Sequence, residues 1–250
     1  MNATPSHALT VQQLTVRFGG IVALSDVDLT VRDGSRHGIL GPNGSGKTTL
    51  FNSISGLNTP SAGTITMLGK DVTRQRARNR ARMGLARTFQ ITSLFPSLTV
   101  RENVAMATRM ADNVAANWWT PASGQTKALA DAGAMLEQLH IERLASRTVR
   151  SLGYGEQRQL EIAMALATRP SVLLLDEPTA GLSNAETTAL TELVRTFPAD
   201  LTVLIIEHDL GVIFDLTDQL TVLQNGVVIA DGPSDVIRED PIVKEVYLGR

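Results

Sequence analysis

The stretch that decides the fold is Gly41-Pro42-Asn43-Gly44-Ser45-Gly46-Lys47-Thr48-Thr49, which matches the pattern G-x-x-x-x-G-K-[ST] through Thr48. Its glycines allow the backbone to fold around phosphates with N–H groups pointing inward. Lys47 can supply a mobile charge for the β- and γ-phosphates, and Thr48 can offer a hydroxyl to Mg²⁺. The alternative is a glycine-rich surface turn. The motif favours a P-loop NTPase without distinguishing a kinase, a GTPase, a helicase or a transporter motor.

The segments around this loop alternate between strand-like and helical patterns. Strand-like segments occupy residues 9–18, 23–31, 37–40, 63–67, 84–89, 172–175 and 201–206. Helical patterns cover residues 47–54 and 184–196, and a longer helical block runs from about 99 to 167. A helix beginning near Lys47 would add its positive N-terminal end to the phosphate loop.

This order predicts the α/β class: a P-loop NTPase (RecA-like) core, an N-terminal antiparallel β subdomain and an inserted helical subdomain. We expect one domain spanning residues 1–250. Its α/β core, with the β subdomain, would comprise residues 1–92 and 168–250, and the helical subdomain about 93–167.

Two carboxylates, Asp176 and Glu177, follow the apolar run 172–175. Ligands of open α/β sheets bind beside the carboxyl ends of the strands, so Asp176 could hold Mg²⁺ through water. Glu177 could polarise an attacking water. The alternative is an ordinary strand exit. His208 and Gln90 also follow strand-like segments, but no spacing rule singles them out.

Composition narrows the function classes. The chain has 250 residues, 43% hydrophobic, a formal net charge of −2 and no cysteine. It can bury a full core. The charge argues against a generally basic nucleic-acid binder, and the absence of cysteine excludes disulfides, thiolate metal sites and a cysteine nucleophile. No apolar run approaches the roughly 18 residues that span a bilayer, and the N-terminus lacks the pattern of a signal peptide.

A run of arginines occupies residues 74–87. A nucleic-acid patch is one interpretation. Spacing of two distributes these side chains around a helix, which favours solvated surface or proximity to lipid headgroups. We therefore expect no nucleic-acid partner.

Five pieces stand in an order that resembles the nucleotide-binding subunit of an ABC transporter, over nearly the whole chain. They are GPNGSGKTT at 41–49, Gln90, LGYGE at 152–156, LLLDEP at 173–178 and His208. The segment LGYGEQRQ resembles the signature motif of that family. Phe18, in VRFGG, stands where the family has an aromatic ring that stacks on adenine, which a π-face can do. The alternative for Phe18 is strand core.

The resemblance implies a mechanism with ATP and Mg²⁺. Two subunits face each other head to tail, and each ATP lies between one phosphate loop and the signature of the other subunit, here Gly153, Tyr154, Gly155 and Glu156. That signature segment begins a helix, and it presents its N–H groups and the positive N-terminal end of the helix to the γ-phosphate. The resemblance also makes Glu177 the base for water, His208 a γ-phosphate contact and Gln90 a Mg²⁺ contact that reports to the membrane partner.

Longer segments, including the ending DGPSDVIREDPIVKEVYLGR, resemble ATPase subunits of branched-chain amino-acid importers, in particular the one with the longer helical insert. This implies a second ATPase subunit (a copy or a different chain), membrane permease subunits and, indirectly, a solute-binding protein. The implied location is the cytoplasmic face of the inner membrane, as a peripheral subunit. The cargo would be hydrophobic amino acids or a related small amide.

Two residues depart from the family pattern. The signature commonly reads Leu-Ser-Gly-Gly-Gln, so Gly153 replaces the serine and removes one phosphate donor, worth about 1 to 3 kcal/mol if buried. Ser183, in AGLS, replaces the usual aspartate, which weakens an expected contact across the pair. If the second ATPase subunit is a different chain, the two ATP sites of the pair would then be unequal.

Two other functions remain open from the residues. A soluble ABC-type ATPase that acts on ribosomes usually fuses two such domains, and the DNA-repair type carries a long coiled coil. This chain has one phosphate loop and no sustained heptad run. A P-loop kinase or GTPase would not need the signature, and the guanine-reading pattern Asn-Lys-x-Asp is absent.

Overall fold

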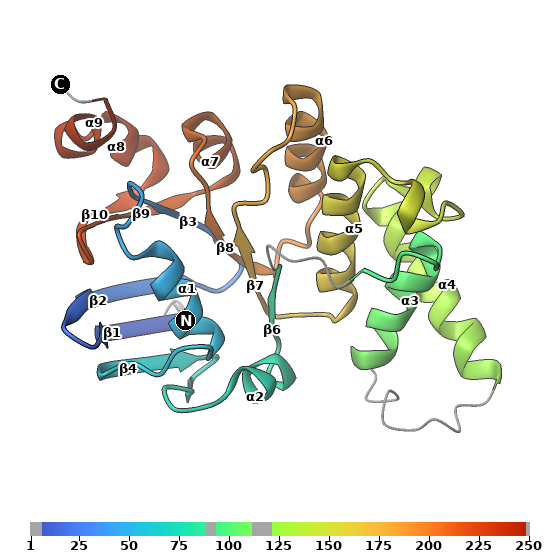
Figure 1. Cartoon of the computed structure of the whole chain (residues 1–250), viewed down its shortest axis with the longest axis horizontal. Helices are drawn as coiled ribbons and strands as arrows, with labels where there is room; N and C mark the ends of the chain where they lie inside the picture. The colour runs from blue at the N-terminus through green and yellow to red at the C-terminus, as the bar shows by residue number, and fades with distance from the viewer. Residues whose placement is uncertain (1–6, 89–93, 112–121, 249–250) are drawn as a thin grey trace, which may run out of the picture. The chain divides into compact units, whose positions relative to one another are not determined.

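The computed structural model describes residues 7–88, 94–111 and 122–248 (Figure 1). The chain forms two compact units. We call the first, which comprises residues 1–85, 171–177 and 199–250, the sheet unit. The second, which comprises residues 86–170 and 178–198, is the helical unit. No helix of the described residues has the length and apolar character needed to span a membrane.

One sheet of the sheet unit is antiparallel, with strand order β2-β1-β4-β5. Its strands are β1 (His7–Phe18), β2 (Ile21–Arg32), β4 (Ala62–Met67) and β5 (Lys70–Asp71). β1 and β2 form a hairpin in which Phe18 pairs with Ile21 beside the turn. Alternating apolar and polar residues favour such a sheet, because successive side chains point to opposite faces. The predicted antiparallel subdomain is confirmed.

The other sheet has six strands in the order β10-β9-β3-β8-β7-β6. Its strands are β3 (Arg36–Leu40), β6 (Leu85–Arg87), β7 (Val172–Asp176), β8 (Thr202–Ile206), β9 (Gln219–Gln224) and β10 (Val227–Pro233). β3, β7, β8 and β9 are parallel, and β10 runs antiparallel to β9. β7 and β8 are buried along their whole length, as expected for apolar runs covered on both faces.

Helix α1 (Lys47–Ser55) joins the cores of the two sheets. Its side chains Leu50, Phe51 and Ile54 are fully buried in one cluster with residues of β1, β2, β3, β7 and β8. The helix begins after Gly46 and ends before Gly56, and both glycines have left-handed backbone. Burial on both sides fixes the axis of α1, and therefore the direction of its N-terminus.

The remaining helices of the sheet unit are α2 (Ala77–Arg82), α7 (Leu210–Leu216), α8 (Ser234–Glu239) and α9 (Pro241–Leu248). The predicted α/β class is confirmed, because helices alternate with the parallel strands along the chain.

The helical unit contains α3 (Val100–Ala111), α4 (Ala122–Gln138), α5 (Tyr154–Ala167) and α6 (Asn184–Arg195), with 3₁₀ turns at Glu142–Leu144 and Val149–Ser151. Helix α3 packs against α4 and α5, and α6 packs against α5. A capping box begins α3, in which Thr99 and Glu102 satisfy each other's backbone N–H groups. This unit adds residues 178–198 to the segment 93–167, for which the sequence predicts a helical subdomain.

Arg80 contradicts the expected solvated surface for the whole arginine run. Its side chain is fully buried, whereas Arg74, Arg76, Arg78 and Arg82 are exposed. Sequence spacing could not reveal this burial, because it depends on what α2 packs against.

Among the described residues, the buried Arg80 guanidinium donates only to backbone carbonyls. Nη1 donates to the oxygens of Ser53 (2.6 Å) and Ile54 (2.7 Å), Nε donates to Gln75 and Nη2 to Thr73. The last carbonyls of a helix lack intrahelical partners and attract positive charge, so Arg80 closes the C-terminus of α1. Burial lowers the pKa of Arg80 to about 10, which leaves the side chain charged at neutral pH.

We expect Arg80→Lys to destabilise the fold by about 3 kcal/mol, because one ammonium cannot reach four carbonyls and leaves buried acceptors unpaired. Urea unfolding measures this free energy. The control is Arg78→Lys, in the exposed part of α2, which should change it little. Equal stability of the two variants would contradict the role assigned to Arg80.

Candidate active site

The phosphate loop connects the end of β3 to the start of α1, as the sequence predicts. Gly46, the residue before α1, has φ = 106°. A Cβ at this position would lie 2.6 Å from Leu24 Cδ2 and 2.9 Å from the Ala23 oxygen. Only glycine fits here, because it combines left-handed backbone with close contact to β2.

A second hairpin supports the loop. Gly226, in the turn between β9 and β10, donates its N–H to the Ser45 oxygen at 2.9 Å, and its own oxygen accepts from Ser25 N–H at 2.9 Å. The loop is therefore fixed between the start of β2 and the β9–β10 turn. This rigidity keeps its N–H groups in place before a ligand arrives.

Lys47 is held close to the loop backbone. Its side chain is buried, and Nζ donates to the oxygens of Gly41 (2.6 Å) and Pro42 (3.1 Å). Burial lowers the pKa of the ammonium, and the charges of Glu177 and Asp176 oppose this shift. A flexible stem lets the ammonium turn from these carbonyls toward an anion in the loop.

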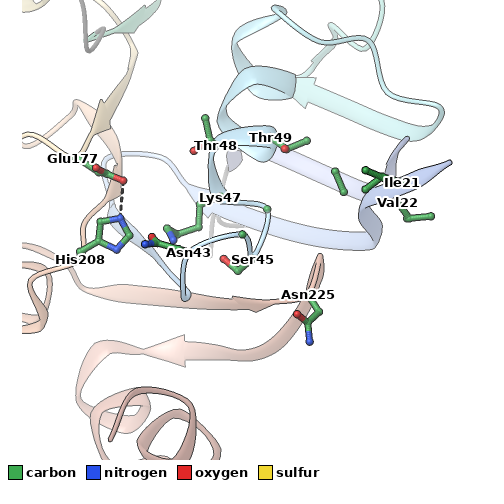
Figure 2. Close-up of a pocket in the computed structure, with 13 residues that line it drawn as sticks. Ile21, Val22, Asn43, Ser45, Lys47, Thr48, Thr49, Glu177, His208 and Asn225 are labelled. Carbon is green, nitrogen blue, oxygen red and sulfur yellow. Dashed lines mark hydrogen bonds and ion pairs between the residues drawn. The ribbon is translucent and has the colours of Figure 1, made fainter. Parts of the chain in front are cut away.

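A cavity of about 430 Å³ opens over the loop (Figure 2). Its lining consists of Ile21, Val22, Ala23, Asn43, Gly44, Ser45, Gly46, Lys47, Thr48, Thr49, Glu177, His208 and Asn225. Lys47 is the only cation among these residues. All of them belong to the sheet unit, so this site lies within one compact body.

The carboxyl ends of β7 and β8 bring an acid and an imidazole together. His208 Nε2 donates to Glu177 Oε1 at 2.7 Å, the contact dashed in Figure 2. Glu177 has φ = 48°, and its N–H donates to the Ile206 oxygen. A left-handed conformation is unfavourable for glutamate, and such conformations cluster at functional sites. The backbone turn places the Glu177 carboxylate against the cavity.

Oxygen donors suitable for Mg²⁺ are present. Thr48 lines the cavity, and Asp176 is a buried carboxylate at the end of β7. The described residues contain no group of three or more histidine, aspartate or glutamate side chains arranged to hold a metal. Mg²⁺ usually keeps several waters and uses few protein ligands together with substrate phosphates, so this small oxygen set fits the ion.

The signature residues lie in the helical unit, at the start of α5. Gly153 is the N-cap residue, and its N–H donates to Glu156 Oε2 at 3.0 Å. Arg143 and Arg147 donate to the other oxygen of Glu156. Tyr154, the first residue of α5, is half exposed. The Glu156 side chain therefore stabilises the start of the helix.

The cavity brings together most of the candidate residues of the sheet unit, from Asn43 to Thr49 with Glu177 and His208. Gly41 and Pro42 lie at the base of the loop. Phe18 is 51% exposed and is not among the lining residues. Gln90 lies outside the described residues.

Sequence reasoning missed four lining residues: Ile21, Val22, Ala23 and Asn225. The first three follow Phe18 in the same hairpin, and an aliphatic stretch there resembles any strand. Asn225-Gly226 is a typical hairpin turn, but its contact with the phosphate loop is not encoded in local sequence.

Comparisons with known proteins agree on one family. A family model described as "ABC transporter" matches residues 24–180. A second, described as "Branched-chain amino acid ATP-binding cassette transporter", matches residues 227–250. The chain is 38% identical to the high-affinity branched-chain amino acid transport ATP-binding protein BraF of Pseudomonas aeruginosa, over 96% of this chain and 97% of BraF. It is 37% identical to LivG of Escherichia coli, over the same shares.

Solved structures give the same result. An ATP-binding cassette of an ABC transporter in its ADP conformation matches with a TM-score of 0.84 and 30% identity, covering 98% of this chain and 100% of that chain. A dimeric cassette in a post-hydrolysis state, bound to ADP and phosphate, matches with a TM-score of 0.74 and 25% identity, covering 90% and 98%.

We expect Lys47→Ala to weaken binding of a nucleoside triphosphate by about tenfold or more, because a charged hydrogen bond contributes about 1.5 to 3 kcal/mol. Titration calorimetry with ATP measures the affinity. Lys70→Ala, on the exposed strand β5, is the control and should bind normally. Unchanged affinity of Lys47→Ala would refute the assignment of the phosphate loop.

Proposed function

The chain belongs to the ATP-binding subunits of ABC transporters, and on this premise we propose that it powers an importer of branched-chain or other hydrophobic amino acids, or of related small amides. The activity of the family is ATP hydrolysis. One observation carries the proposal for this chain: a single cavity combines a phosphate loop, its lysine and the paired Glu177 and His208.

In this proposal the phosphate loop binds the triphosphate through its N–H groups and the N-terminus of α1. Lys47 leaves the carbonyls of Gly41 and Pro42 and contacts the β- and γ-phosphates. The lowered pKa of Lys47 reflects a desolvated ammonium, which an anionic phosphate would stabilise. Binding would therefore exchange two carbonyl contacts for a charged one.

Glu177 accepts a proton from the attacking water, and the water oxygen then bonds to the γ-phosphorus while the bond to the β-phosphate oxygen breaks. His208 orients the carboxylate at 2.7 Å. Its ring can then turn its N–H to the γ-phosphate. The products are ADP and inorganic phosphate.

Thr48, Asp176 and Gln90 would hold Mg²⁺, and the first two offer the oxygen donors described above. The ion, when bound with the nucleotide, neutralises charge on the phosphates. Phe18 is proposed to stack on adenine. Its exposed ring and the aliphatic Ile21 and Val22 beside it provide an apolar surface for a base.

We further propose that the working form is a pair of ATPase subunits, with the signature of each against the nucleotide of the other. The solved relative that is dimeric with ADP and phosphate bound supports the pairing itself. The partner is a second copy or a different ATPase subunit. The pair would work on membrane permease subunits at the cytoplasmic face of the inner membrane, with a solute-binding protein delivering cargo.

We expect Glu177→Gln to trap an ATP-bound pair and to abolish phosphate release, because the amide keeps the shape of the side chain but cannot accept the proton. Light scattering with ATP measures the mass, and a phosphate assay measures turnover. Glu137→Gln, on the exposed side of α4, is the control and should hydrolyse ATP normally. A monomer that still hydrolyses ATP would disprove the base assignment.

The transport role has its own test. Affinity purification from detergent-solubilised membranes, followed by mass spectrometry, should recover permease subunits. Deletion of the chain should abolish uptake of labelled leucine, and the wild-type chain but not Lys47→Ala should restore it. Ribosome association without permeases would contradict the transporter role, and normal leucine uptake would contradict the cargo.

A further inference from the structure

One carboxylate connects the start of α6 to the signature. Glu186 Oε2 accepts from the Ser183 hydroxyl (2.7 Å) and from the Ser183 N–H (2.9 Å). The other oxygen, Oε1, accepts from the Gly155 N–H at 3.2 Å. All three residues belong to the helical unit. Glu186 therefore caps its own helix and also occupies a backbone donor of the signature helix.

The absence of a side chain at Gly155 makes this contact possible. A Cβ there would lie 2.7 Å from Glu186 Oε1 and 2.8 Å from Glu186 Cγ. The hydrogen bonds from Ser183 and Gly155 hold the pKa of the Glu186 carboxyl below its usual range. The group at the Gly155 N–H is thus an anion at neutral pH.

The two carboxylates at the start of α5 differ in their partners. Glu156 caps Gly153, and Arg143 and Arg147 balance its charge. Glu186 forms no salt bridge with another described residue and is held only by neutral donors. A further anion that approaches Gly155 meets the uncompensated charge of Glu186.

We propose that Glu186 occupies the Gly155 N–H in the separated subunit, competes there with the γ-phosphate of the partner's nucleotide, and turns away when the pair closes. This inference rests on the proposed function, which places the signature against that phosphate. An N–H donates well to one acceptor at a time, and two anions held close together near a protein surface repel each other. Glu186 therefore weakens ATP-dependent pairing.

Ser183 contributes to this restraint. Its hydroxyl and N–H both hold Glu186 Oε2, so they orient the other oxygen toward Gly155. An aspartate at position 183 would carry no hydroxyl donor and would repel the Glu186 carboxylate. The serine at position 183 thus favours the state in which Glu186 accepts the hydrogen bond from the Gly155 N–H.

The test uses the full chain with Glu177→Gln, which stops hydrolysis. Analytical ultracentrifugation with ATP gives the dissociation constant of the pair. Adding Glu186→Gln should lower this constant about tenfold, because the amide keeps the length and an acceptor oxygen but loses the charge. The matched control, Glu192→Gln on the exposed face of the same helix, should stay within about twofold, as surface changes usually do.

Thermal unfolding without nucleotide shows whether each variant folds, and Glu186→Asp provides a second change that keeps the charge but shortens its reach to Gly155. We expect Glu186→Asp also to tighten pairing. If Glu177→Gln pairs with ATP but neither change at Glu186 tightens it, the inference is overturned and the proposed function stands. If no variant pairs, the proposed pairing fails and this inference fails with it.

Discussion

The rest of the structure depends on one constraint, that the backbone from Gly41 to Lys47 is held in place between the end of β3 and the start of α1. This requires a buried strand before the loop and a buried helix after it. β3 lies between β8 and β9, and α1 joins the cores of both sheets. Arg80 closes the far end of α1, and Gly226 supports the loop itself. Much of the sheet unit therefore serves to hold one short loop.

The parallel topology concentrates chemistry at one edge. β3, β7 and β8 end at the same edge, and the residues that follow them are the phosphate loop, Glu177 and His208. Three segments far apart in sequence thus meet because parallel strands share a direction. The strained backbone at Glu177 and the 2.7 Å contact to His208 complete this arrangement.

Much of this was predictable. Apolar periodicity located β1, β2, β3, β4, β6, β7, β8 and α1 within a few residues but did not predict β5, β9 or β10. The motif located the loop between β3 and α1. Other features were not, since they depend on partners distant in sequence. Burial of Arg80 follows from the carbonyls at the end of α1, and the lining by Ile21, Val22 and Asn225 follows from how two hairpins approach the loop. The restraint on Gly155 follows from the packing of α6 against α5.

The sequence by itself determined the α/β class, the phosphate loop and the chemical groups available at the ends of β7 and β8. These features depend on local residue type, on periodicity and on glycine backbone freedom, all of which can be read along the chain. Only the tertiary structure decided which donors already have acceptors. The Gly155 N–H donates to Glu186, Lys47 Nζ donates to two carbonyls, and His208 donates to Glu177. Such pairings arise when packing brings remote segments together, and no local pattern specifies them.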